Sequence, residues 1–125
     1  MFTHLMVGSN DLAKSKTFYD AALGALGHAP GFDAGTQAFW SGPQGAFGVT
    51  RPIDGNPAQF ANGGTIGFAA PDKDAVDAFH AAGIAAGGTC EGEPGLRPNA
   101  PGRAYGAYLR DPDGNKICAF CQLPE

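Results

Sequence analysis

The sequence of 125 residues has few charged side chains and no cluster of one sign, because 8 Lys and Arg stand against 12 Asp and Glu. The eight basic residues are scattered from Lys14 to Lys116. A nucleic-acid-binding protein needs a concentrated basic face, so we expect no nucleic acid as a partner. Nor does any apolar run approach the roughly 18 residues of a membrane span, and the amino terminus lacks the segments of a signal peptide. No membrane is expected as a partner either.

Cysteine is scarce as well. The chain has three cysteines, an odd number that is too small for a framework of disulfides. A reducing compartment is typical of such a chain, so we predict a cytoplasmic protein.

Glycine and proline, in contrast, are abundant: together they make up 30 of the 125 residues. Disordered chains combine such a composition with high charge, whereas 43% of this chain is hydrophobic and only 16% is charged. The composition therefore predicts a compact protein with many short elements and turns.

A repeat with an offset of 61 residues relates the two halves of the chain. Each half opens with an apolar segment typical of a strand, followed by Asp11 or Asp72 as the cap of a helix with apolar residues at helical spacing. We predict an α+β fold in which two βαβββ modules form one sheet-lined cleft with the helices outside. The single domain would span 1–125, with module 1 at about 1–56, a connector at about 57–63 and module 2 at about 64–122.

The strands are predicted from short runs rich in β-branched and aromatic residues between turn signals. The last two runs are joined by an Asp-Gly turn, which predicts a hairpin. Residues 92–103 are expected to form a loop. The predicted strands are Phe2–Val7, Thr36–Trp40, Ala46–Arg51, Thr65–Ala69, Thr89–Glu91, Ala104–Arg110 and Lys116–Gln122.

Two motifs resemble the vicinal oxygen chelate superfamily, which includes glyoxalases, bleomycin-resistance proteins and extradiol dioxygenases. One is the opening, with His4 on a strand, then Asn10-Asp11-Leu12, Phe18-Tyr19 and Leu23-Gly24; the other is the hairpin from Tyr108 to Lys116. The resemblance covers the whole chain. It implies paired βαβββ modules curving around a cleft, and a homodimer.

The resemblance also implies where metal ligands would stand, on four strands. His4 occupies the first position and Thr65 the second, and the two Glu-type positions fall near Val49 and at Cys118. Valine cannot bind a metal and threonine is a poor ligand for zinc-like cations, so only His4 and Cys118 are candidates. We therefore expect an incomplete metal site and no metal cofactor.

Other side chains are candidates to line the cleft. Trp40 and Phe39 are neighbours on a strand, so only one of them faces inward. Arg97 and Arg103 flank a loop rich in proline and glycine, where a guanidinium group could bind a carboxylate; a rigid lid or a dimer contact is the alternative. Tyr105 is a further aromatic candidate.

Cys118 and Cys121 form a Cys-x-x-Cys motif, but residues three apart on a strand point to opposite faces. We expect Cys121 to fill the core and Cys118 to face the cleft. If the final hairpin pairs symmetrically about its turn, Tyr108 lies opposite Cys118 on that face. His28 is expected on an exposed loop and His80 at a helix surface.

These residues favour a glyoxalase/bleomycin-resistance-like protein that binds a small molecule in an apolar cleft. The alternative is a divergent metal-dependent enzyme, either a lactoylglutathione-lyase-like lyase or a ring-cleaving dioxygenase. It would hold a divalent metal such as zinc, nickel or iron through His4, Cys118 and a further ligand, Glu91 or Glu93. A scaffold without a cleft is the third interpretation. Whether the chain is an enzyme stays open at this point.

Overall fold

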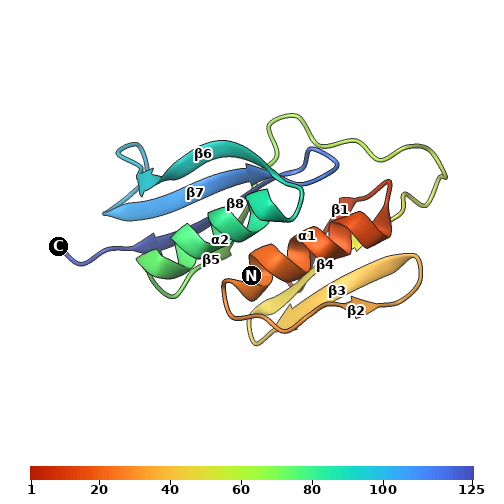
Figure 1. The fold of residues 1–125 in the computed structure, drawn as a ribbon, viewed down its shortest axis with the longest axis horizontal. Helices are drawn as coiled ribbons and strands as arrows, with labels where there is room; N and C mark the ends of the chain where they lie inside the picture. Colours follow the sequence, from red (N-terminus) through yellow and green to blue (C-terminus); the bar gives the residue numbers. More distant parts are fainter.

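The computed structural model describes residues 1–125 as two four-stranded sheets, each with one helix, and thereby confirms the predicted α+β fold of two βαβββ modules (Figure 1). The strands of the sheets run in the orders β1-β4-β3-β2 and β5-β8-β7-β6, and the first pair of each sheet is parallel. The first module contains β1 (His4–Gly8), α1 (Leu12–Gly24), β2 (Phe32–Asp33), β3 (Gln37–Gly42) and β4 (Gly45–Thr50). The second contains β5 (Ile66–Ala69), α2 (Lys73–Ala85), β6 (Thr89–Leu96), β7 (Ala104–Arg110) and β8 (Lys116–Gln122).

The two helices have the same length and lie 61 residues apart, as the repeat predicted. Each begins after its predicted cap: Asp11 accepts a hydrogen bond from the Lys14 backbone at 3.1 Å, and Asp72 accepts one from Ala75 at 2.8 Å. Beyond each helix, the chain turns at a glycine with a left-handed backbone, Gly27 or Gly87. The same local signals therefore start and stop both helices.

The repeat changes offset after the helices. In the first sheet Leu5 pairs with Phe47, and in the second Ile66 pairs with Ile117, so the last strands are 70 residues apart rather than 61. The extra residues lie around the edge strands β2 and β6. No strand was expected at β2, and β6 continues to Leu96 where a loop from residue 92 was expected. The sequence signals underestimate both edge strands because one is very short and the other rich in glycine.

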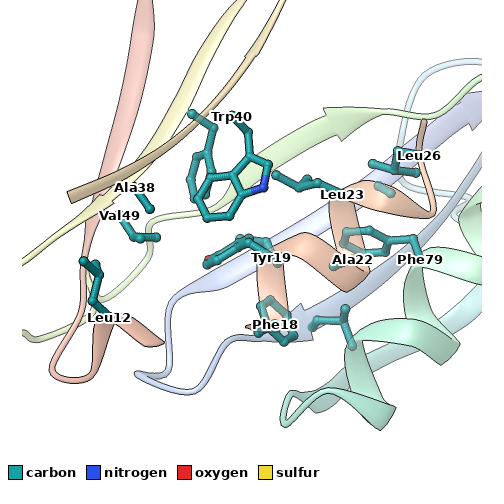
Figure 2. Close-up of a cluster of buried hydrophobic side chains, with 14 residues drawn as sticks. Leu12, Phe18, Tyr19, Ala22, Leu23, Leu26, Ala38, Trp40, Val49 and Phe79 are labelled. Atoms are coloured by element: carbon teal, nitrogen blue, oxygen red, sulfur yellow. The ribbon is translucent and has the colours of Figure 1, made fainter. Parts of the chain in front are cut away.

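The main hydrophobic core is built around α1 and shared by both modules (Figure 2). Tyr19 packs its ring against Trp40 and Phe47, with ring centroids 5.6 and 4.7 Å away. Buried side chains of the second module, including Phe79 and Leu109, complete this cluster. A smaller core of Val76, Tyr105 and Ala107 lies within the second module alone.

The turn between β7 and β8 ties the second module to the first. The Tyr19 hydroxyl donates to the buried Asp111 carboxylate at 2.6 Å, and the Asn115 side-chain amide donates to the Gly8 carbonyl at 3.0 Å. The Asn10 backbone donates to Asp113 at 2.9 Å. The hairpin turn predicted from Asp-Gly is thus also a contact between modules. Neither helix has the length and apolar character that crossing a membrane would require.

Candidate functional site

A groove of about 570 Å³ lies between the modules. Its walls come from β1, the end of α1 and the β3–β4 hairpin in the first module, and from β5 in the second. Most of the lining is apolar, with Leu23, Leu26, Trp40, Phe47 and Phe68 among it. Figure 2 shows the side chains of Trp40, Leu23 and Leu26 near one another. This is a concave, mostly apolar site of the kind that binds small molecules.

Two histidines, together with Thr3 and Gln44, give the groove its hydrogen-bonding side chains. His4 is exposed at the start of β1, and its Nδ1 atom lies 2.8 Å from the Thr3 hydroxyl. His28 is half-buried, not exposed as expected, because the left-handed turn at Gly27 folds the chain back and His28 donates its backbone N–H to Leu23. Its proximity to a helix-ending Gly27 is the one sequence signal that could have placed it there.

Trp40 is held rigidly in the groove wall. Its Nε1 atom donates to the Asp20 carboxylate at 3.0 Å, which also accepts from Lys16 at 2.7 Å and from the Gly31 backbone at 2.8 Å. Burial raises the pKa of Asp20, but these hydrogen bonds and the Lys16 charge outweigh it, so the pKa lies below its usual value. The ionised carboxylate is therefore a stable acceptor for the indole at neutral pH.

A second group of predicted residues meets on the sheet of the second module. Tyr108 pairs directly with Cys118, as the symmetric hairpin predicted. Arg97 and Lys116 both stack on the Tyr108 ring, 5.5 and 5.1 Å from its centre, and Phe120 meets it edge to face. Burial raises the pKa of Cys118 to about 11, although the charges of Lys116 and Arg97 oppose this shift. At neutral pH, Cys118 is therefore a protonated thiol.

The remaining predicted site residues lie outside the groove. Val49 is fully buried in the main core, and Thr65 is exposed just before β5. Arg103 is exposed on a loop, and its side chain makes no hydrogen bond. Arg97 binds no carboxylate: its guanidinium donates to the backbone carbonyls of Glu93 and Gly95. Of the seven predicted residues, the structure brings His4 and Trp40 together in the groove, and Tyr108 and Cys118 together on the second sheet.

The residues present do not fit the four-ligand metal site that the resemblance implies. The register makes Gly48, not Val49, the counterpart of Cys118, since they pair with Met6 and Gly67 respectively. A glycine offers no ligand, and burial, which raises the pKa of Cys118 to about 11, makes the thiolate that a metal requires harder to form. His4 is left as the one strong donor of the set, so no chemical step of this chain is derived through such a metal.

One histidine lies in an unexpected environment. His80, expected at a helix surface, is only 8% exposed, and its Nε2 atom lies 3.1 Å from the Cys90 sulfur. Ten residues separate these side chains along the chain, and no motif signals the contact. The prediction failed because periodicity along α2 does not show that Cys90, at the start of β6, packs against His80.

Comparison with known proteins gives a consistent result. The family model described as Glyoxalase/Bleomycin resistance protein/Dioxygenase superfamily matches residues 2–119. A solved glyoxalase/bleomycin resistance protein from Albidiferax ferrireducens is 60% identical, with a TM-score of 0.92 over 96% of this chain and 98% of that one. A glyoxalase-related enzyme from Fulvimarina pelagi is 19% identical, with a TM-score of 0.75 over 96% and 86%.

A lactoylglutathione lyase from Agrobacterium tumefaciens is 23% identical, with a TM-score of 0.65 over 96% of this chain and 92% of that one. At such identity the likeness shows the fold alone. The comparison with curated proteins found no match. The chain belongs to the glyoxalase/bleomycin resistance protein/dioxygenase superfamily.

Proposed function

We propose that this superfamily member binds a small, largely apolar molecule in the groove between its modules. The observation that supports this is the groove itself, whose volume of about 570 Å³ suits a small ligand and whose walls are mostly apolar. Burial of a ligand's apolar surface against Leu26, Phe47 and Phe68 would supply most of the binding free energy. Trp40 also lines the groove, but it is only 4% exposed, so it would contact the ligand at the groove wall without stacking on it.

The two histidines define the polar end of that ligand. His4 and His28 both line the groove, and an imidazole both donates and accepts hydrogen bonds. No lysine, arginine, aspartate or glutamate lines the groove. A ligand with an apolar body and one carboxylate, sulfonate or phenol group fits this arrangement best.

The alternative is a metal-dependent lyase or a ring-cleaving dioxygenase. Its support is the shared fold, which carries binding proteins and enzymes alike. The donor set around His4 and Cys118 does not favour it, because Gly48 offers no ligand and burial makes the Cys118 thiol hard to ionise. The homodimer implied by the family resemblance stays a prediction.

Trp40 is the one tryptophan of the chain, so its fluorescence reports directly on the groove. We expect the hydrophobic anion 8-anilinonaphthalene-1-sulfonate to quench Trp40 emission saturably, with one probe molecule bound per chain. Ala69→Leu, which adds bulk to an exposed groove residue on β5, should weaken binding about tenfold, because overfilling costs about 1–3 kcal/mol. Ala78→Leu, at an exposed position on α2 outside the groove, is the matched control and should bind like the unmodified chain.

A second arm tests the histidines. His28→Leu should weaken binding of the anionic probe more than binding of its uncharged analogue, N-phenyl-1-naphthylamine. The proposal fails if quenching never saturates, or if Ala69→Leu and Ala78→Leu bind the anionic probe equally well.

A further inference from the structure

A cluster of three metal-binding side chains lies at the far edge of the second module. His80, Cys90 and Glu93 offer one nitrogen, one sulfur and one oxygen atom, all within 4.8 Å of one another. His80 comes from α2, and the other two come from β6, the edge strand opposite β5 in the sheet order. None of the three lines the groove, so the cluster is separate from the site proposed above.

An irregularity in β6 brings Cys90 and Glu93 together. On a regular strand these residues, three apart, would point to opposite faces. The pairing of β6 with β7 shifts register between Cys90 and Gly92 and again between Gly92 and Gly95. These irregularities change the face to which the following side chains point, so that the Cys90 sulfur lies 3.6 Å from Glu93 Oε1.

Arg97 supports this irregular part of β6. Its guanidinium donates to the Glu93 carbonyl at 2.6 Å and to the Gly95 carbonyl at 3.0 Å while stacking on Tyr108. A side chain thus holds two main-chain carbonyls of this irregular segment. The Glu93 backbone is anchored before any ion arrives.

We propose that His80, Cys90 and Glu93 form a zinc-binding site. In a tetrahedral zinc site with ordinary bond lengths of about 2.0–2.3 Å, the ligand atoms lie about 3.5 Å apart. Here sulfur and nitrogen are 3.1 Å apart, sulfur and oxygen are 3.6 Å apart, and nitrogen and oxygen lie within 4.8 Å, so side-chain movements of about 1 Å bring the three atoms to zinc distances. Zinc would replace the hydrogen bond between the sulfur and Nε2, and the thiol proton would pass to water.

The donor set favours zinc over the harder divalent ions. Thiolate and imidazole ligands suit zinc, whereas magnesium and calcium take oxygen ligands almost exclusively. His80 is buried and Cys90 half-buried, which limits their movement, whereas Glu93 is exposed. Three protein ligands with one exposed side leave the fourth position of the tetrahedron to water.

Cobalt(II) is the direct probe because it adopts zinc geometry and is coloured. Added to chelator-treated protein, it should bind at one equivalent per chain and give a thiolate-to-cobalt charge-transfer band with the visible bands of a tetrahedral ion. Zinc should then displace it. Zinc should also raise the melting temperature of the protein, because it links α2 to β6 in the folded state only.

Variants assign the ligands. Cys90→Ser should remove the charge-transfer band and weaken cobalt binding at least about 100-fold, beyond the usual effect of outer-shell changes. His80→Gln should weaken binding comparably while retaining the sulfur ligand. Arg97→Met should leave the band in place and weaken binding about tenfold, which marks Arg97 as a positioning residue.

Cys121→Ser and Cys118→Ser are matched controls, since they change the chain's other two cysteines. Both should keep the cobalt spectrum. The proposal is overturned if cobalt gives no thiolate band, if the band survives in Cys90→Ser, or if Cys121→Ser abolishes it. Circular dichroism of each metal-free variant shows whether it is folded. If Cys90→Ser does not fold, the loss of cobalt affinity in a folded His80→Gln variant tests the proposal instead.

Discussion

The two modules share one backbone plan but differ in how they use it. The main core takes most of its buried side chains from the first module, including the aromatic group of Phe18, Tyr19, Trp40 and Phe47. The second module has only a small core of its own, yet it carries all three cysteines of the chain. The first module therefore supplies most of the packing, whereas the second supplies all of the thiols.

The difference is sharpest at one helix position. Tyr19 on α1 and His80 on α2 are 61 residues apart and equivalent in the repeat. Tyr19 is fully buried among aromatic rings, and its hydroxyl reaches Asp111 across the module boundary. His80 contacts Cys90 within its own module. The same position thus serves long-range packing in one copy and a local polar cluster in the other.

Alanine at each of these two positions provides the strongest test of this contrast. Tyr19→Ala should lower the free energy of unfolding by about 4 kcal/mol, because it leaves a cavity the size of an aromatic ring in the main core. His80→Ala should cost only about 1–2 kcal/mol, since it removes a smaller ring and one hydrogen bond. Urea denaturation in the presence of a chelator measures both. Equal losses of unfolding free energy would show that the two helix positions contribute equally to packing.

A smaller effect separates two tyrosine hydroxyls, one from each module. Burial raises the pKa of Tyr19 well above its usual value, so the hydroxyl remains a donor to Asp111 at neutral pH. Tyr19→Phe should cost about 1–2 kcal/mol because the buried Asp111 carboxylate loses a donor. Tyr105→Phe removes a similar bond to Asp77, whose side chain is 40% exposed and can turn to water instead. That variant should cost about 0.5 kcal/mol.

Urea denaturation again measures the two variants. The prediction is contradicted if Tyr105→Phe is the more destabilising of the pair. Such a result would mean that the Tyr105–Asp77 hydrogen bond within the second module stabilises the fold more than the Tyr19–Asp111 bond between the modules.

The parts of the fold that local signals control were predictable. Asp11 and Asp72 cap their helices because a carboxylate one residue before a helix meets free backbone N–H groups, whatever surrounds it. The final hairpin was equally local: an Asp-Gly turn sets the pairing of Tyr108 with Cys118. In both cases a few neighbouring residues determine the local structure, and the rest of the fold does not change it.

The site was less predictable because it depends on contacts between distant segments. Alternation showed that Phe39 and Trp40 face opposite ways, but only packing against Tyr19 and Phe47 turns Trp40 inward. His80 meets Cys90 where a helix packs against the edge strand, and Glu93 reaches Cys90 only through a bulge in a glycine-rich stretch that has the composition of a loop. Signals from neighbouring residues carry no information about such pairings.

The last predicted effect depends on pH and contrasts Cys118 with Gly48, its counterpart in the first sheet. Burial raises the pKa of the Cys118 thiol from 9.0 to about 11 in the folded chain. Between these values the unfolded chain loses the thiol proton and the folded chain keeps it, so stability falls as pH rises from about 9 to about 11. Gly48 contributes no such dependence to the first module.

Cys118→Ala should therefore flatten the decline of the free energy of unfolding above pH 9, while below pH 8 the curves of the variant and the unmodified chain should run parallel. Urea denaturation at a series of pH values gives both curves. An unchanged alkaline slope would mean that Cys118 ionises as readily in the folded chain as in the unfolded one. The thiol would then lose its proton to a metal more easily, which would weaken one of the two reasons against a metal centre beside His4. The absence of a ligand at Gly48 would stand regardless, because it depends on the register of the sheet rather than on any ionisation.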